Sequence, residues 1–182
     1  MKLPWHLVPT VCLLGVSNLI STQAAQAEDG ENSPVHLYVR EIPLKIFQKE
    51  VKTIAIEQAD GTKAFEPLSS RGFNVEVVNQ LTEPTSIHWH GVLLPPLMDG
   101  VPFVSQEPIP PGGRFVYKFP LQQSGTYWMH SHFGLQEQLL AAAPLILQSE
   151  EQKAKADQQY VVLLSDFSFK PPAKFWLNSK GA

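Results

Sequence analysis

The sequence has 182 residues, of which 43% are hydrophobic and 17% charged, and its formal net charge is −3. This length suits one globular domain with a core and is short for two ordinary domains. A slightly acidic chain is a poor binder of nucleic acid, so we expect no nucleic-acid partner. The 16 prolines and 11 glycines are spread along the chain, which is typical of many short strands joined by turns.

Residues 1–27 have the pattern of a secretory signal peptide. Lys2 precedes an apolar run that is too short to span a bilayer comfortably, and Ala25-Gln26-Ala27 fits a cleavage site. We therefore expect an exported protein, located in the bacterial periplasm, with no membrane span after the signal is removed. Cys12 is the one cysteine of the sequence and lies inside this signal. The mature chain is then expected to have no disulfide, thiolate nucleophile or thiolate metal ligand.

The chain after the signal reads as a succession of short strands. Residues 73–81 alternate, with Phe73, Val75 and Val77 on one face and polar side chains on the other. A short helical excursion is predicted at residues 135–143, ended by Pro144. The succession predicts an all-β sandwich, with strands expected at residues 35–47, 51–58, 73–81, 86–94, 114–119, 124–132 and 145–148.

The last part of the chain has a different character. Residues 149–159 are polar and charged, which predicts a linker or an exposed helical turn. Residues 160–167 are apolar and are expected to begin a new buried strand. The sequence therefore predicts a signal peptide at 1–27, one domain at 28–149, and a linker with the start of an incomplete second domain at 150–182.

Four histidines fall in two H-x-H pairs, His88 with His90 and His130 with His132. Because side chains two apart in a strand share a face, each pair points one way, with Trp89 or Ser131 on the other face. A single such pair is often an exposed strand face without function. Two pairs favour a metal site, and imidazole nitrogens suit copper, zinc, iron and nickel. Spacing alone leaves zinc open, and the isolated His36 is interpreted as structural.

These residues resemble the N-terminal cupredoxin (plastocyanin-like) domain of multicopper oxidases, most of all the CopA-type copper-resistance oxidases. The similar stretches are "TSIHWHGVLLPPLMDGVP", "QEPIPPGGRFVYKFPLQQSGTYWMHSHFGLQEQ" and "APLILQ". The resemblance implies a cupredoxin-like Greek-key β-sandwich that contributes to a trinuclear copper cluster. It implies that His88 binds the type 2 copper, that His90 and His130 share one type 3 copper, and that His132 binds the other.

The resemblance also gives Asp99, in "MDGVP", the role of a proton-relaying acid near the type 2 copper. The alternative for Asp99 is the first residue of a type I′ turn, and the two interpretations are compatible.

The family takes four more cluster histidines, and the cysteine of its blue copper site, from a C-terminal domain. This sequence has none of them, so we expect the chain by itself to be inactive. The first hypothesis is the N-terminal part of a multicopper oxidase, whose complete enzyme couples one-electron oxidation of a substrate or Cu(I) to four-electron reduction of O2 to water. The alternative is a stand-alone exported module that binds or sequesters copper without turnover. A third option is assembly with another chain, or with copies of itself.

Overall fold

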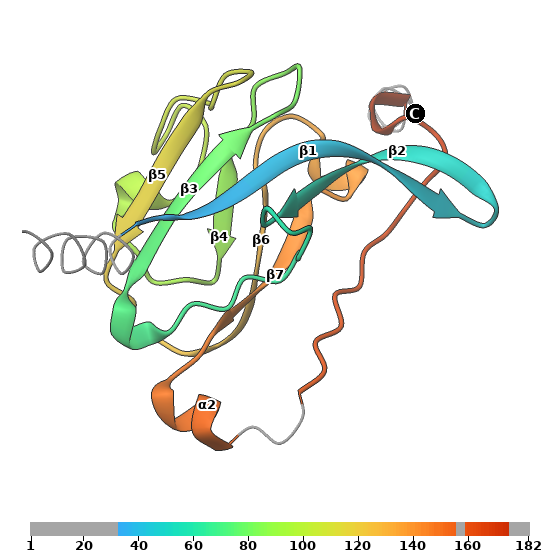
Figure 1. Ribbon diagram of the computed structural model, residues 1–182. Helices are drawn as coiled ribbons and strands as arrows, with labels where there is room; N and C mark the ends of the chain where they lie inside the picture. Colours follow the sequence, from blue (N-terminus) through green and yellow to red (C-terminus); the bar gives the residue numbers. More distant parts are fainter. Residues whose placement is uncertain (1–32, 156–158, 175–182) are drawn as a thin grey trace, which may run out of the picture. The chain divides into compact units, whose positions relative to one another are not determined.

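The structure, a computed structural model, describes residues 33–155 and 159–174. Its strands form two sheets (Figure 1). The four-stranded sheet has the order β2-β1-β3-β5, and β1 pairs in parallel with β3. Its members are β1 (Val35–Ile46), β2 (Lys49–Glu57), β3 (Phe73–Asn79) and β5 (Arg114–Phe119). The three-stranded sheet has the order β4-β6-β7, with β4 (Ile87–His90), β6 (Gly125–Ser131) and β7 (Ala142–Leu147).

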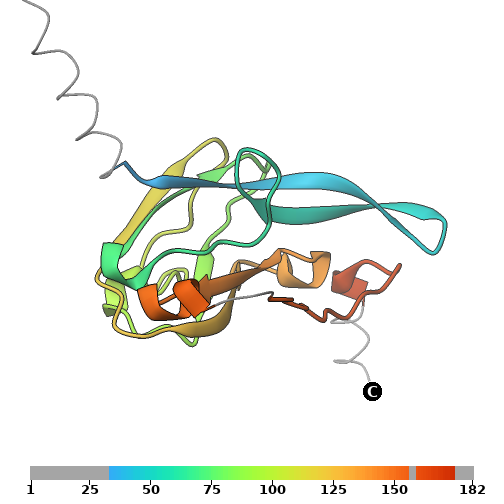
Figure 2. The same cartoon turned by 60° about the horizontal axis from the view of Figure 1, so that its bottom comes forward.

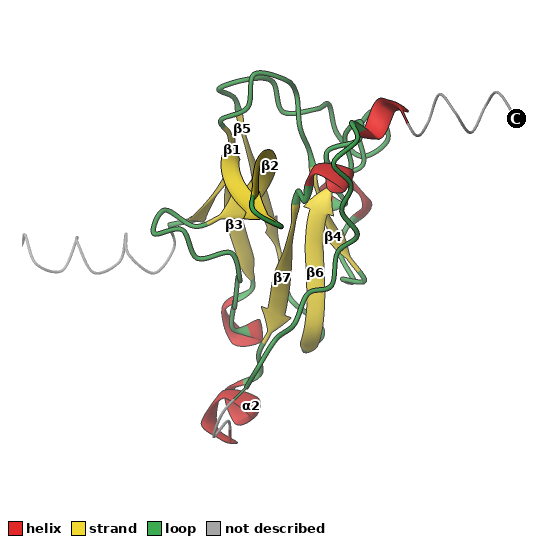
Figure 3. Cartoon of the chain, turned by 90° about the vertical axis from the view of Figure 1, so that its right-hand side faces the viewer, coloured by secondary structure: helices red, strands yellow, loops and turns green. Residues whose placement is uncertain are grey.

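The two sheets lie face to face as a sandwich (Figure 3) and bury the apolar side chains that alternate along their strands. Phe73, Val75 and Val77 are buried, as the alternation predicts. Trp89 of β4 joins the layers, because its ring packs edge-on against Phe73 at 4.7 Å and against Tyr117 at 4.9 Å. The prediction of an all-β sandwich is confirmed.

Strands β1 and β2 form a hairpin that extends past the other strands (Figure 2). Its loop is Phe47-Gln48, and both residues have positive φ angles, 46° and 67°. Positive φ at both central residues defines a type I′ turn, whose twist matches that of the flanking strands. Beyond Val39, β1 buries no residue, whereas the opposite residues of β2, Thr53, Ile54 and Ala55, are buried.

Short helical turns connect the strands: η1 (Ser69–Arg71), η2 (Pro96–Met98) and η3 (Glu137–Leu139). The helical excursion expected at 135–143 is only the turn η3, and β7 already begins at Ala142. Pro144 thus lies inside a strand rather than before it. The strand tolerates this proline because β7 has a full partner on one side only, with an isolated bridge from Leu145 to Phe65 on the other.

The predicted strand at 86–94 is shorter than expected and ends at His90, since Gly91 turns the chain with a φ of 80°. Residues 160–167 form no strand and are largely exposed, against expectation. They pair with none of the strands that the structure describes, so their backbone has no ladder to join.

The polar stretch after β7 contains the exposed helix α2 (Glu150–Lys155), in agreement with the prediction. The predicted signal peptide at 1–27, with Cys12, lies outside the described residues. Among the residues that are described, no helix has the length and apolar character to cross a membrane.

Candidate metal site

The neighbouring strands β4 and β6 place the histidines. Their antiparallel register sets His88 directly opposite His130, Trp89 opposite Met129, and His90 opposite Trp128. Trp89 and Met129 are fully buried in the core. Because side chains alternate, the flanking histidines must lie on the other face of the same sheet. His88 and His90 therefore meet His130 on one face, while His132 follows the end of β6.

Three of the four predicted histidines converge closely. Potential ligand nitrogens of His88, His90 and His130 all lie within 4.8 Å of one another. Within this group, His90 Nδ1 lies 3.4 Å from His130 Nε2. His132 adjoins this group, with its ring 5.7 Å from that of His88 and 6.1 Å from that of His130, but it does not belong to the converging triad.

The ring of His88 is oriented by Asp99, which contacts its Nδ1 atom. His88 Nδ1 lies 2.8 Å from the backbone oxygen of Asp99 and 3.2 Å from its carboxylate Oδ1. A carbonyl oxygen can only accept a hydrogen bond, so Nδ1 of the ring carries the proton. The lone pair of the neutral ring is then on Nε2, the nitrogen available to a metal ion.

Asp99 reaches His88 because of the backbone around Gly100. Asp99 has α-helical angles, while Gly100 has a φ of 75° and lies against β4. A Cβ atom on Gly100 would fall 1.8 Å from the backbone oxygen of Ile87, so only glycine fits. The Asp-Gly pair does not form the type I′ turn considered above, because Gly100 alone has a positive φ there.

His130 has a similar arrangement with different partners. Its Nδ1 lies 3.1 Å from the backbone oxygen of Ser131 and 3.3 Å from Glu137 Oε2. Burial lowers the pKa of His130, and its neighbours His88 and His90 lower it further, while Ser131 and Glu137 act in the opposite direction. The lowered pKa favours the neutral ring, which is the form that binds metal ions.

Sequence reasoning missed three residues around the site: Trp128, Gln136 and Glu137. Trp128 stacks on His130 with ring centroids 4.3 Å apart and lies 4.9 Å from the ring of His90. The period of two already placed Trp128 on the histidine face, so the signal was present. Nothing in the pattern identified Gln136 and Glu137, because their places depend on the turn η3.

The donor set fits a transition metal bound through nitrogen. Two nitrogens that share one metal ion at about 2.0–2.1 Å in tetrahedral geometry are separated by roughly 3.3–3.4 Å. The separation between His90 and His130 matches this value. Within the described residues, no sulfur belongs to the converging group, whose members are three histidines. Such a set suits copper or zinc.

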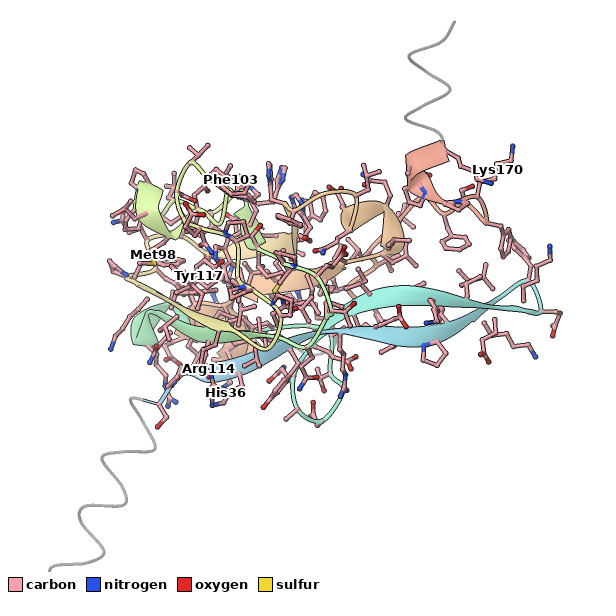
Figure 4. All side chains as sticks on the ribbon, turned by 90° about the horizontal axis from the view of Figure 1, so that it is seen from above. His36, Met98, Phe103, Arg114, Tyr117 and Lys170 are labelled. Atoms are coloured by element: carbon pink, nitrogen blue, oxygen red, sulfur yellow. The ribbon has the colours of Figure 1, made fainter. Side chains whose placement is uncertain are left out.

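His36 lies elsewhere, on the four-stranded sheet. Its Nδ1 is 2.9 Å from Glu76 Oε2, and Arg114 approaches the same oxygen at 3.4 Å. Figure 4 shows His36 and Arg114 together, well away from Phe103 in the loop that follows β4. His36 is not a member of the histidine group.

Comparison with known proteins identifies similar sequences. A sequence profile described as multicopper oxidase matches residues 45–152, more than half of the chain. Copper resistance protein A of Pseudomonas syringae pv. tomato is 50% identical over 99 residues, which cover 54% of this chain and 16% of that protein. Copper resistance protein A of Escherichia coli is 48% identical over 99 residues, covering 54% of this chain and 16% of that protein.

The fold of the chain is also similar to solved structures of multicopper oxidases. The crystal structure of a multi-copper oxidase from Pseudomonas thermotolerans superimposes with a TM-score of 0.58 at 30% identity, covering 63% of this chain and 29% of that chain. The chain thus matches only about a sixth of the length of its curated relatives.

Proposed function

The chain belongs to the multicopper oxidase family, and we propose that it supplies the N-terminal half of the ligands for a trinuclear copper site. In this proposal His88 binds the type 2 copper, His90 and His130 share one type 3 copper, and His132 binds the other. The complete enzyme would couple one-electron oxidation of a substrate or Cu(I) to reduction of O2 to water. The observation that carries the proposal is the convergence of His90 Nδ1 and His130 Nε2 at 3.4 Å.

When bound, the copper ions supply the redox chemistry that passes electrons to O2. The work of this chain is to hold neutral imidazoles in the right orientation. His88 and His130 donate hydrogen bonds from Nδ1–H to backbone oxygens, which leaves Nε2 of each ring free to bind. Trp128 covers one face of the His130 ring and restricts its rotation.

Asp99 is proposed to hold a proton for this chemistry. Its Oδ1 lies 3.2 Å from His88 Nδ1, and the side chain is 37% exposed. A carboxylate that touches both a ligand ring and solvent can exchange protons between them. The same carboxylate also orients the His88 ring. Substitution of Asp99 by alanine would therefore remove both the proton exchange and part of the ring orientation.

Four histidines leave each copper with an incomplete set of ligands, so the remaining ligands must come from another domain or another chain. The loop that begins right after His90 presents exposed apolar side chains at Leu93, Leu97, Phe103 and Val104. Apolar groups of this size beside an incomplete site are typical of a surface that a partner covers. We propose that the protein is exported and that it binds this partner in the periplasm.

The test is a copper titration of the purified chain from residue 28 onward, together with its absorption spectrum. We expect at most about one copper per chain with useful affinity, since no copper has a full ligand set. We also expect no intense blue band, because that band requires a copper–thiolate bond. Three tightly bound coppers in a monomer, or O2 uptake by the monomer, would contradict the half-site proposal.

The second candidate function is a stand-alone copper-binding module. It is favoured by the fact that three ligand nitrogens already converge within a single chain. Tight binding of one copper without any oxidase activity, even after addition of further domains, would support it. Sedimentation with and without copper separates both candidates from assembly of copies, which predicts a copper-dependent dimer.

A further inference from the structure

The paired histidines of β4 and β6 are supported in the same way. His88 and His130 face each other across the strands, and each directs Nδ1 at one backbone oxygen and one carboxylate. For His88 both oxygens belong to Asp99. For His130 they belong to two residues, Ser131 and Glu137, at 3.1 and 3.3 Å. His90 differs, because its own Nδ1 is the nitrogen turned toward His130.

We propose that Glu137 is a positioning residue, which fixes the ring and the tautomer of His130 so that Nε2 faces His90. This inference rests on the proposed metal site and adds a residue to it. The Ser131 oxygen is the hydrogen-bond partner of His130 Nδ1, and the carboxylate of Glu137 lies 3.3 Å from the same nitrogen, where its charge favours the Nδ1–H form. The Nε2 lone pair of His130 is thereby turned toward the nitrogen with which it would share a metal ion. Ser131 follows His130 directly in β6, so its oxygen is near the ring through local geometry alone. Glu137 belongs to the turn η3 and constrains the His130 ring from outside the strand.

Gln136 explains why an exposed glutamate stays at this place. Its side chain is 2% exposed, and its Oε1 accepts from Thr85 Oγ1 at 2.8 Å and from Ser131 Oγ at 2.7 Å. Its Nε2 donates to Glu83 Oε1 at 2.8 Å and to the backbone oxygen of Pro84 at 2.9 Å. A buried amide with every hydrogen-bonding site satisfied is held firmly.

The backbone of Gln136 is anchored as well as its side chain. Its oxygen accepts from the N–H groups of Leu139 at 3.0 Å and Ala141 at 3.1 Å, which closes the turn η3. Glu137 is the first residue of that turn, so its position follows from that of Gln136. The turn therefore links the segment before β4 to the end of β6 and places Glu137 behind His130.

The test compares Glu137→Leu, Glu137→Gln and the control Gln138→Leu, which changes a neighbouring exposed side chain of the same turn. The first readout is the ¹⁵N chemical shifts of the His130 ring in the copper-free protein, at a pH where imidazoles are neutral. His130→Ala assigns the signals, and thermal melting verifies that each variant is folded.

We expect His130 to be protonated at Nδ1 in the unchanged protein and in Gln138→Leu, and to become a mixture of tautomers in Glu137→Leu. Glu137→Gln should keep most of the Nδ1–H form, because the amide oxygen still presents a partial negative charge to Nδ1–H. Copper affinity should fall about 10-fold or more in Glu137→Leu, the loss typical of removing a partner of a metal ligand, and much less in Glu137→Gln.

An unchanged His130 tautomer in folded Glu137→Leu would overturn the proposal, because the Ser131 oxygen would then suffice. An equal tautomer change in Gln138→Leu would also overturn it, since the effect would not be specific to the carboxylate. The first readout needs no copper. A chain that binds no copper but shows the tautomer change refutes the proposed function alone, and copper binding without any effect of Glu137 refutes this inference alone.

Discussion

The two sheets of the sandwich use histidine in opposite ways. On the four-stranded sheet, His36 contacts the carboxylate of Glu76, and Arg114 contacts the same carboxylate. The ring nitrogen of His36 is thus directed at an acidic side chain and not at another histidine. On the three-stranded sheet His88, His90 and His130 face one another and point ring nitrogens at a shared volume. The difference teaches that the neighbours of a histidine decide its role, since the strand context is the same in both sheets.

The largest expected effect separates the two faces of the histidine strands. Trp89→Ala should lower the free energy of unfolding by about 3–5 kcal/mol, because it removes a fully buried ring that joins the sheets. Trp128→Ala, on the histidine face, should lower it by less than about 2 kcal/mol and mainly weaken copper binding. Urea denaturation of both variants measures the first quantity. Equal losses would mean that the two faces are not distinct.

The loop that brings Asp99 to His88 is the next place to break the site. Gly100→Ala should lower the free energy of unfolding by about 3 kcal/mol, because a positive φ and a clash with β4 combine. Gly112→Ala, in the turn before β5, is the matched control, with a φ of 70° and no atom within 4 Å of the added Cβ. It should cost only about 1–2 kcal/mol. A similar cost for both would refute the close approach of Gly100 to Ile87.

Removing a ring from each sheet tests the comparison directly. His90→Ala and His130→Ala should each lower copper affinity about 100-fold, more than the usual effect of losing a partner of a ligand. His36→Ala should leave the affinity unchanged, since His36 lies outside the group. Competitive titration with a copper chelator gives the three values. Equal effects of His36→Ala and His90→Ala would refute the shared site.

The smallest expected effect is a pH dependence of stability. The pKa of His130 is lowered by burial, so in acid the unfolded chain takes up a proton that the folded protein resists. The contribution is fully present above the unfolded pKa of about 6.5, and it is lost as pH falls from there toward the lowered folded pKa. Unfolding of copper-free protein across this range should show a slope that is reduced in His130→Gln. An unchanged slope would exclude His130 as its source.

The sequence was sufficient to predict the β-sandwich and the histidines that share one face of a strand. Alternation predicted that Phe73, Val75 and Val77 are buried, and the period of two put His88 and His90 on one side of β4. The same period places Trp128 on the face of the histidines. These features follow from local backbone geometry, in which the direction of a side chain depends only on its place along the strand.

The tertiary structure decided the rest. Residues 160–167 are as apolar as the true strands, yet they have no partner strand in the described chain and stay exposed. The approach of His88 to His130 depends on pairing between segments some forty residues apart, and Glu137 reaches His130 only through the buried amide of Gln136. Sequence by itself determined which side chains share a face of a strand. Which faces meet, and what holds their rings, depends on contacts between distant segments that no local pattern encodes.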